Sequence, residues 1–180
     1  MTAENWGALL LVLLGFALAC ALGAWGARRI WAPASLALLL AAGGVAGAAE
    51  LVLRDELQTV LVAIGGALAV AGGGPLTALV FDLVDRREPT MESMDRAGHV
   101  LRGGAWIGAL ERLAIYASLV AGWPEGVAVV LAVKGLGRYP ELRAAEDGVR
   151  TGAAERFIIG TFVSVLWACG CAGVVLLARA

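Results

Sequence analysis

The stretch "WGALLLVLLGFALACALGAWGA", residues 6–27, contains no charged side chain and decides the fold class. An α-helix needs about 20 apolar residues to cross the roughly 30 Å hydrocarbon core of a bilayer. Backbone groups in lipid must find hydrogen-bond partners within their own segment, so this stretch is predicted to be a transmembrane helix. Because residues 1–8 contain Glu4 and no Lys or Arg, we expect this helix to be kept rather than cleaved as a signal peptide.

The composition of the whole chain agrees with that prediction. Of 180 residues, 60% are hydrophobic and only 16% are charged, which exceeds what the core of a soluble domain of this size requires. We therefore predict an all-α, polytopic integral membrane bundle that forms a single membrane domain over residues 1–180. The six predicted spans are about 6–27, 32–53, 57–74, 103–122, 126–139 and 157–178.

The third span is expected to end at the sequence Gly72-Gly73-Gly74-Pro75. Glycine entropy and the missing proline donor both oppose a continuing helix. Residues 76–87 then show apolar positions at helical spacing among polar ones, which is typical of a short helix lying in the membrane interface. A discontinuous membrane helix is the alternative. Residues 88–102 and 141–155 are predicted to be polar connectors on the cytoplasmic side.

Basic residues are distributed very unevenly between the two sets of loops. If the amino terminus is outside, eleven Lys and Arg residues fall on the inner side, two (Arg54 and Arg179) fall on the outer side, and Arg112 lies within the membrane. The positive-inside rule then predicts a multi-pass protein of the inner membrane with both termini outside.

Two opposite charges lie side by side in the apolar segment "GALERLAIY", residues 108–116. The fourth and fifth spans form a hairpin about Trp123, so Arg112 and Lys134 lie eleven residues before and after the turn. At a rise of about 1.5 Å per residue they lie at the same depth, roughly 16 Å from the turn. Adjacent helical residues point about 100° apart, so Glu111 and Arg112 are expected to face different neighbours.

An unpaired charge near the bilayer centre costs about 2.5–3.5 kcal/mol on insertion scales. This cost favours an ion pair or triad of Glu111, Arg112 and Lys134. The cluster is either a binding or coupling site for a substrate, ion or proton, or a structural strut that joins helices while Lys134 reaches toward the cytoplasm.

Other polar groups extend the candidate site. Tyr116 lies one helical turn from Arg112, and Arg138 lies at the inner end of the fifth span. Thr161 and Ser164 lie three residues apart at a similar level of the sixth span. Tyr116, Thr161 and Ser164 are also typical of hydrogen bonds between membrane helices, which is the structural alternative.

Gly72, Gly73 and Gly74 are candidates for a phosphate or lipid-headgroup site. Free backbone donors at the start of the expected following helix could receive such a group. A hinge explains the three glycines equally well, because no Walker lysine follows them. The three cysteines lie in apolar segments without metal-ligand spacing, so we expect no disulfide, no metal site and no cofactor.

Three segments resemble an uncharacterised family of bacterial polytopic membrane proteins, a domain of unknown function. They are "WIGALER" at 106–112, "KGLGRYPEL" at 134–142 and "AAERFIIGTFVSVL" at 153–166. The resemblance covers about a third of the chain. It implies a small protein of the bacterial inner membrane without an assigned activity.

Three classes of function follow from these features. The first is a transport-type protein or transporter subunit that uses the midplane Glu/Arg/Lys cluster. The second is a non-catalytic membrane anchor or assembly factor that acts through its cytoplasmic connectors. The third and least favoured is a lipid-modifying enzyme, which could draw its acid and base groups from Asp82, Asp85, Glu88, Asp95 and His99.

The expected partners follow from the same features. The bilayer is the main one, and a protein at the cytoplasmic connectors or a second copy of the chain is a further candidate. No nucleic acid is expected as a partner.

Overall fold

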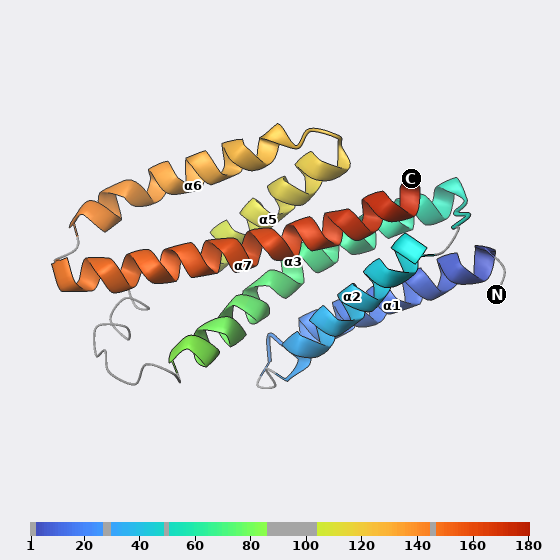
Figure 1. Cartoon of the computed structure of the whole chain (residues 1–180), viewed down its shortest axis with the longest axis horizontal. Coiled ribbons are helices and arrows are strands. Elements are labelled where there is room, and N and C mark those ends of the chain that lie inside the picture. Colours follow the sequence, from blue (N-terminus) through green and yellow to red (C-terminus); the bar gives the residue numbers. More distant parts are fainter. Residues whose placement is uncertain (1–2, 27–29, 49–50, 86–103, 145–146) are drawn as a thin grey trace.

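The structure, a computed structural model, describes residues 3–26, 30–48, 51–85, 104–144 and 147–180. Every regular element in these ranges is helical, which confirms the predicted all-α class. The helices are α1 (Ala3–Gly23), α2 (Trp31–Ala48), α3 (Asp55–Asp85), α5 (Gly104–Val120), α6 (Glu125–Ala144) and α7 (Asp147–Arg179). They run alternately along the long axis, so the start of α1 and the end of α7 lie at the same end of the molecule (Figure 1).

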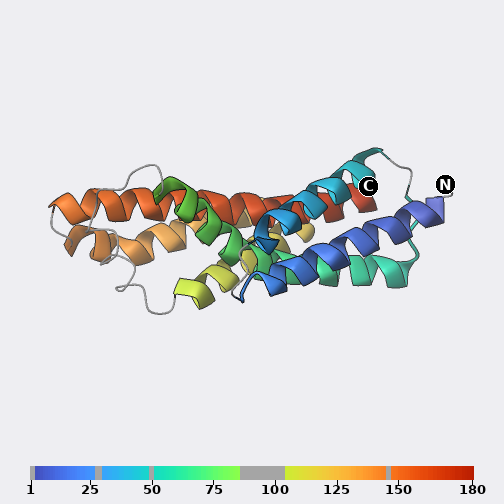
Figure 2. The same ribbon diagram turned by 90° about the horizontal axis from the view of Figure 1, so that it is seen from below.

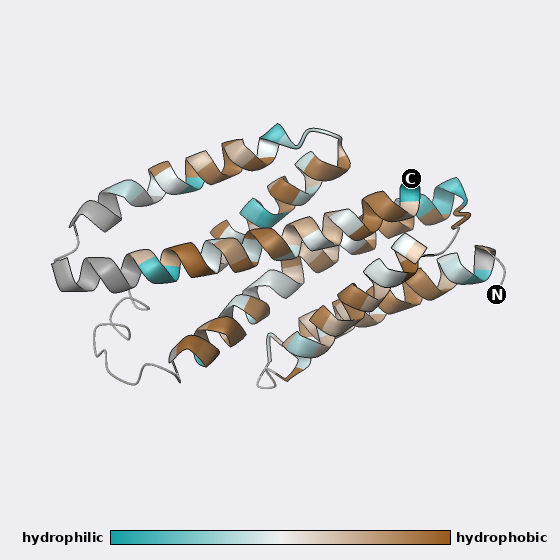
Figure 3. Cartoon of the chain, in the orientation of Figure 1, coloured by the Kyte–Doolittle hydropathy of each residue, from teal (hydrophilic) through white to brown (hydrophobic). Residues whose placement is uncertain are grey.

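Within the described ranges, four helices are long and apolar enough to cross a membrane. The four stretches are Asn5–Gly23, Trp31–Ala48, Asp55–Val84 and Ala154–Arg179. The other two helices differ from these in length or in charge. The 17 residues of α5 make it shorter, and the 20 residues of α6 include Lys134 and Arg138. The coloured ribbon shows the same contrast, with hydrophilic segments in the middle of α5 and along α6 (Figure 3).

The centre of the bundle is formed by α3 and α7, which make the most extensive contact between any two helices of the described chain. α1 and α2 form a hairpin that packs on this pair from one side, and α5 packs on it from the other. α6 contacts α5 and, more lightly, α7, beside which it runs in both views of the ribbon (Figures 1 and 2). None of the buried core residues that the structure describes comes from α6.

Buried positions recur at helical spacing on the inner helix faces. On α1 they are Leu10, Leu14, Ala17 and Ala21. Spacings of three and four residues place these side chains on one stripe, which packs against the neighbouring helices. One polar contact crosses this layer, where the buried Ser35 hydroxyl of α2 donates to the Ala17 carbonyl of α1 at 2.8 Å. Such a bond joins two helices without leaving a polar group unpaired in an apolar region.

The predicted end of the third helix at Gly74 is wrong, because α3 continues through Pro75 to Asp85. The separate interfacial helix over 76–87 and the discontinuous helix are both replaced by one continuous helix. Proline and glycine are tolerated in membrane helices when neighbouring groups satisfy the backbone that they free. The surroundings of Pro75 provide such a group.

The indole of Trp25 satisfies the carbonyl that Pro75 leaves without a donor. In a regular helix the N–H of residue 75 would donate to the carbonyl of Ala71, but proline has no N–H. Instead, Trp25 Nε1 donates to the Ala71 carbonyl at 2.8 Å. The indole also lies over Gly74, where an added Cβ would be 3.0 Å from Trp25 Cζ2. The turn after α1 therefore completes the backbone bonding of α3.

Replacing Trp25 by phenylalanine tests this compensation. The ring contact remains while the donor is lost, so the free energy of unfolding should fall by about 1 kcal/mol. Pro75→Ala restores a backbone N–H to Ala71, so the same tryptophan substitution should cost much less in that background. The measurement is a double-mutant cycle of unfolding in mixed micelles. Equal costs in the two backgrounds would show that the indole does not replace the missing proline donor.

Other predicted boundaries shift by a few residues. The first two helices end at Gly23 and Ala48, before the predicted ends at 27 and 53. Pro140 does not end the fifth span, since α6 continues to Ala144. Most of the predicted connector 141–155 is helical, because its Ala, Glu and Arg residues favour helix and extend both α6 and α7. The predicted connector 88–102 lies outside the described residues.

Candidate functional site

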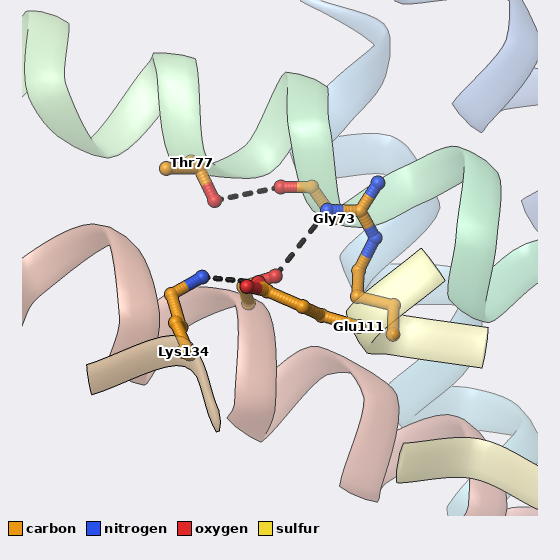
Figure 4. Close-up of polar contacts among 6 residues, drawn as sticks. Gly73, Thr77, Glu111 and Lys134 are labelled. Carbon is orange, nitrogen blue, oxygen red and sulfur yellow. Dashed lines mark hydrogen bonds and ion pairs between the residues drawn. The ribbon is translucent and has the colours of Figure 1, made fainter. Parts of the chain in front are cut away.

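Glu111 and Lys134 form an ion pair between α5 and α6. Lys134 Nζ donates to Glu111 Oε2, and the two side chains point toward each other from neighbouring helices (Figure 4). Both are largely withdrawn from the surface, with 14% of Glu111 and 18% of Lys134 exposed. The hairpin about Trp123 thus places the two residues at the same height, and the predicted pair is confirmed.

Arg112 turns away from this pair toward α3 and α7, and it is only 4% exposed. Its Nε and Nη2 donate to the Val70 carbonyl at 3.1 and 2.8 Å, and its Nη1 donates to Ser164 Oγ at 3.3 Å. Glu111 and Arg112 therefore face different neighbours, as their helical spacing predicts. The hydrogen-bond acceptors of Arg112 among the described residues are neutral oxygens, and Glu111, which is paired with Lys134, acts on its charge through space without contact.

A glycine makes room for the guanidinium stem. A Cβ at Gly73 would lie 2.4 Å from Arg112 Cδ and 2.8 Å from Nε, which is closer than real side chains approach. The hydroxyl of Thr77 donates to the Gly73 carbonyl at 2.7 Å, one turn further along α3 (Figure 4). The middle of α3 is therefore shaped to receive a cation from α5.

Two aromatic side chains also donate to carbonyls of α3. The Tyr116 hydroxyl donates to the Val62 carbonyl at 2.7 Å, and Trp167 Nε1 donates to the Leu68 carbonyl at 3.0 Å. A Cβ at Gly72 would lie 2.2 Å from Trp167 Cζ2. With Trp25 and Arg112, these side chains reach α3 from three other parts of the bundle. The carbonyls of α3 accept hydrogen bonds from all four side chains, and its glycines leave space for them.

A stripe of three residues on α7, Phe157, Thr161 and Ser164, lies on the side of the helix that contacts Lys134 and Arg112. Phe157 lies near Lys134, whose Nζ is 5.8 Å from the ring centroid. Ser164 accepts from Arg112 at the other end of the stripe. Thr161 lies between them, four residues after Phe157 and three before Ser164, on the same helix face. Its Oγ1 is buried and has no hydrogen-bond partner among the described residues.

An apolar groove of about 480 Å³ lies next to this site, between α3 and α5. Its lining residues are Val62, Ala63, Gly66, Ala67, Leu113, Tyr116, Ala117, Val120 and Ala121. Tyr116 is the residue that the groove shares with the candidate site, and its hydroxyl is bonded to Val62. The groove therefore offers apolar surface beside the charged cluster.

The predicted site residues do not form one cluster of mutual contacts but take part in several separate contacts. Glu111 pairs with Lys134, while Arg112 bonds to Ser164. Tyr116 makes its hydrogen bond to α3, as the structural alternative predicted. Arg138 lies on α6, and its side chain is outside the described part of the chain.

The prediction of a headgroup or phosphate site at Gly72, Gly73 and Gly74 loses its physical basis. It required a helix that begins after the glycines, and these residues instead lie within the continuous α3. Their backbone groups belong to a helical ladder, and the missing Cβ atoms provide space for Trp167, Arg112 and Trp25. The glycines serve close packing, which membrane helices commonly achieve with small residues.

Sequence reasoning did not identify the acceptors on α3 or the donor role of Trp25 and Trp167. Every residue has a backbone carbonyl, so the sequence could not show that the carbonyl of Val70 accepts the hydrogen bonds of Arg112. Three consecutive glycines before a proline were the available signal, because glycines inside an apolar helix mark a close approach of another group. The partners of the glycines could not be read from the sequence.

Comparison of the chain with protein-family models, with curated proteins and with solved structures finds no match.

Proposed function

We propose that this chain is a multi-pass membrane protein of transport type, or the membrane subunit of a transporter, with Glu111, Lys134 and Arg112 as its binding or coupling site. The observation that carries the proposal is the Glu111–Lys134 ion pair beside the buried Arg112, midway along α5 and α6. Ionisable groups at membrane depth are expensive, and they commonly mark substrate, ion or proton pathways.

Exposed apolar side chains support six membrane spans rather than four. Large exposed hydrophobics occur on all six helices, and they include Phe16, Leu40, Val60, Leu110, Val133 and Phe162. Soluble proteins rarely expose apolar surface of that extent, whereas lipid solvates it. The 17 residues of α5 are at the short end of the range that crosses a bilayer, and the 20 residues of α6 are ample.

The orientation belongs to the same proposal. The end of the molecule shared by the start of α1 and the end of α7 is proposed to be outside (Figure 1). Arg54 and Arg179 are the basic residues near that end. The sequence places six of the other twelve in the segments that join the helices at the opposite end, and five more on α6 and α7. This distribution supports a cytoplasmic position for the opposite end. The bacterial inner membrane rests on the resemblance of the three quoted segments, which stays a prediction.

Water access to the cluster tests the transport proposal. A cysteine at Gly108 would lie next to Arg112, because a Cβ there is 3.1 Å from Arg112 Nη1. A nearby cation favours the reactive thiolate. In a variant without native cysteines, Gly108→Cys is expected to react with a membrane-impermeant, water-soluble thiol reagent in proteoliposomes.

Leu110→Cys is the matched control on the same helix. Leu110 is 65% exposed on the apolar outer surface, so its cysteine would face lipid and resist the same reagent. If Gly108→Cys also resists the reagent from both sides of the membrane, no aqueous path reaches the cluster and the transport proposal fails.

A second candidate function is a membrane anchor or assembly factor. It is favoured by the lengths of α3 and α7, which have 31 and 33 residues where about 20 cross a bilayer. At about 1.5 Å per residue, both helices have length to extend beyond the hydrocarbon core. Purification of the full chain from native membranes tests this function. A stoichiometric soluble partner would support it, and purification without one would count against it.

A further inference from the structure

We propose that the cluster binds a small monovalent anion, held between Arg112 and Lys134 by the hydroxyl of Thr161. This inference deepens the proposed function, because it names the class of solute that the site takes. It concerns binding alone, so it can be tested without any measurement of transport.

The charge of the cluster favours an anion. Glu111 contributes one negative charge, while Arg112 and Lys134 contribute two positive charges, which leaves one positive charge in excess. The carboxylate is already paired with Lys134, and the hydrogen bonds of Arg112 within the described chain go to the Val70 carbonyl and the Ser164 hydroxyl. Because electrostatic interactions are stronger in a medium of low dielectric constant, an uncompensated charge there attracts an anion.

Arg112 has donors left for such a ligand. A guanidinium carries five N–H groups, and Arg112 makes three hydrogen bonds within the described chain. Its stem is fixed against Gly73, where a Cβ would meet Cδ at 2.4 Å. The cation is therefore held in position by neutral groups before any ligand arrives.

Thr161 provides the second, independent observation. Its Oγ1 is buried and lacks a hydrogen-bond partner among the described residues. A threonine hydroxyl in a helix commonly donates to the carbonyl four residues earlier, and an unpaired buried hydroxyl costs about 1–3 kcal/mol. The hydroxyl lies on the α7 stripe between Phe157, which neighbours Lys134, and Ser164, which bonds Arg112. A bound anion would accept its hydrogen bond.

Because the cluster carries one positive charge in excess, it favours a ligand with a single negative charge. A halide or a small carboxylate neutralises the cluster, whereas a divalent anion such as sulfate leaves a net negative charge in its place. Chloride and formate should therefore bind more tightly than sulfate. We use chloride as the probe, because it has no shape requirement beyond its radius.

The experiment measures the melting temperature of the full chain in detergent during a titration with sodium chloride. Sodium gluconate keeps the ionic strength constant, because gluconate is too bulky for a buried site. A ligand that binds only the folded state raises the melting temperature in a saturable way. In Thr161→Val the midpoint of the chloride titration should rise about tenfold, which corresponds to about 1.4 kcal/mol.

Two further variants make the result specific. Thr161→Ser keeps the hydroxyl, so its midpoint should stay within about twofold of the native value. Thr59→Val removes a hydroxyl of α3 that donates to the Asp55 carbonyl at 3.1 Å on the exposed surface, and it should leave the midpoint unchanged. Should the valine variant fail to fold, Thr161→Ala removes the same hydroxyl with a smaller side chain, and its midpoint should also rise about tenfold.

The inference is overturned if the native chain shows no saturable response to chloride, or if Thr161→Val responds with the native midpoint. Its failure is distinguishable from that of the transport proposal. If chloride binds but Gly108→Cys does not react, the anion site stands and the transport proposal fails, because no aqueous path reaches the cluster. If Gly108→Cys reacts but chloride does not raise the melting temperature, the transport proposal stands and the solute is not a small anion.

Discussion

Replacing Gly72 by alanine is expected to lower the free energy of unfolding by about 2–3 kcal/mol. The added methyl group would lie 2.2 Å from Trp167 Cζ2, well inside van der Waals contact. The ring cannot move aside freely, because it is 3% exposed and its Nε1 donates to the Leu68 carbonyl at 3.0 Å. Overpacking of this kind costs about 1–3 kcal/mol, and the strained hydrogen bond adds about 1 kcal/mol. The measurement is equilibrium unfolding in mixed micelles.

Gly44→Ala is the matched control for this substitution. Gly44 lies within α2 and an added Cβ would meet nothing within 4 Å. Alanine is favoured over glycine in a helix by up to about 1 kcal/mol, so this variant should be as stable as the native chain or more so. Equal stability of the two variants would show that the indole does not need the space above Gly72.

Replacing Lys134 by methionine should destabilise the bundle by about 3 kcal/mol. The substitution keeps most of the length of the side chain and removes the only charge that pairs directly with Glu111 in the described chain. Breaking a buried pair leaves an uncompensated charge, whereas replacing both partners by neutral groups is often nearly neutral. The double variant Glu111→Gln with Lys134→Met should therefore recover most of the lost stability in the same unfolding measurement.

Glu125→Gln is the control for charge removal on α6. Glu125 lies exposed in the first turn of that helix, and surface substitutions usually change stability by less than about 0.5 kcal/mol. A methionine variant at position 134 that is as stable as the native chain would mean that the ion pair contributes nothing to the fold. A double variant no more stable than the single one would contradict the pairing itself.

The charged pair could be predicted because it depends on local regularities. The turn about Trp123 and the fixed rise of a helix place residues equidistant from the turn at one height. The apolar surroundings then require that opposite charges meet. The different directions of Glu111 and Arg112 follow from the angle of about 100° between consecutive helical residues. These three rules favoured an ion pair or triad of Glu111, Arg112 and Lys134, and the structure contains the Glu111–Lys134 pair.

The course of α3 could not be predicted, because it depends on contacts between distant segments. Local propensity at the three glycines and Pro75 favours a break. The helix continues because Trp167, Arg112 and Trp25 occupy the space above the glycines, and because one indole replaces the proline donor. Each of these groups arrives from another part of the chain. Tertiary contacts thus override the local preference, and the expected headgroup site disappears with the break.

The central position of α7 has a consequence for biosynthesis. α7 follows the other five described helices in the chain and is synthesised after them, yet it is one of the two helices around which the bundle packs. Trp167 and Ser164 reach their partners on α3 and α5 only after the helices that precede α7 have been translated. Until then the faces of α3 and α5 that contact α7 lack their partner, and the earlier helices form only part of the bundle. Packing of the described helices is therefore completed only when α7 has been made.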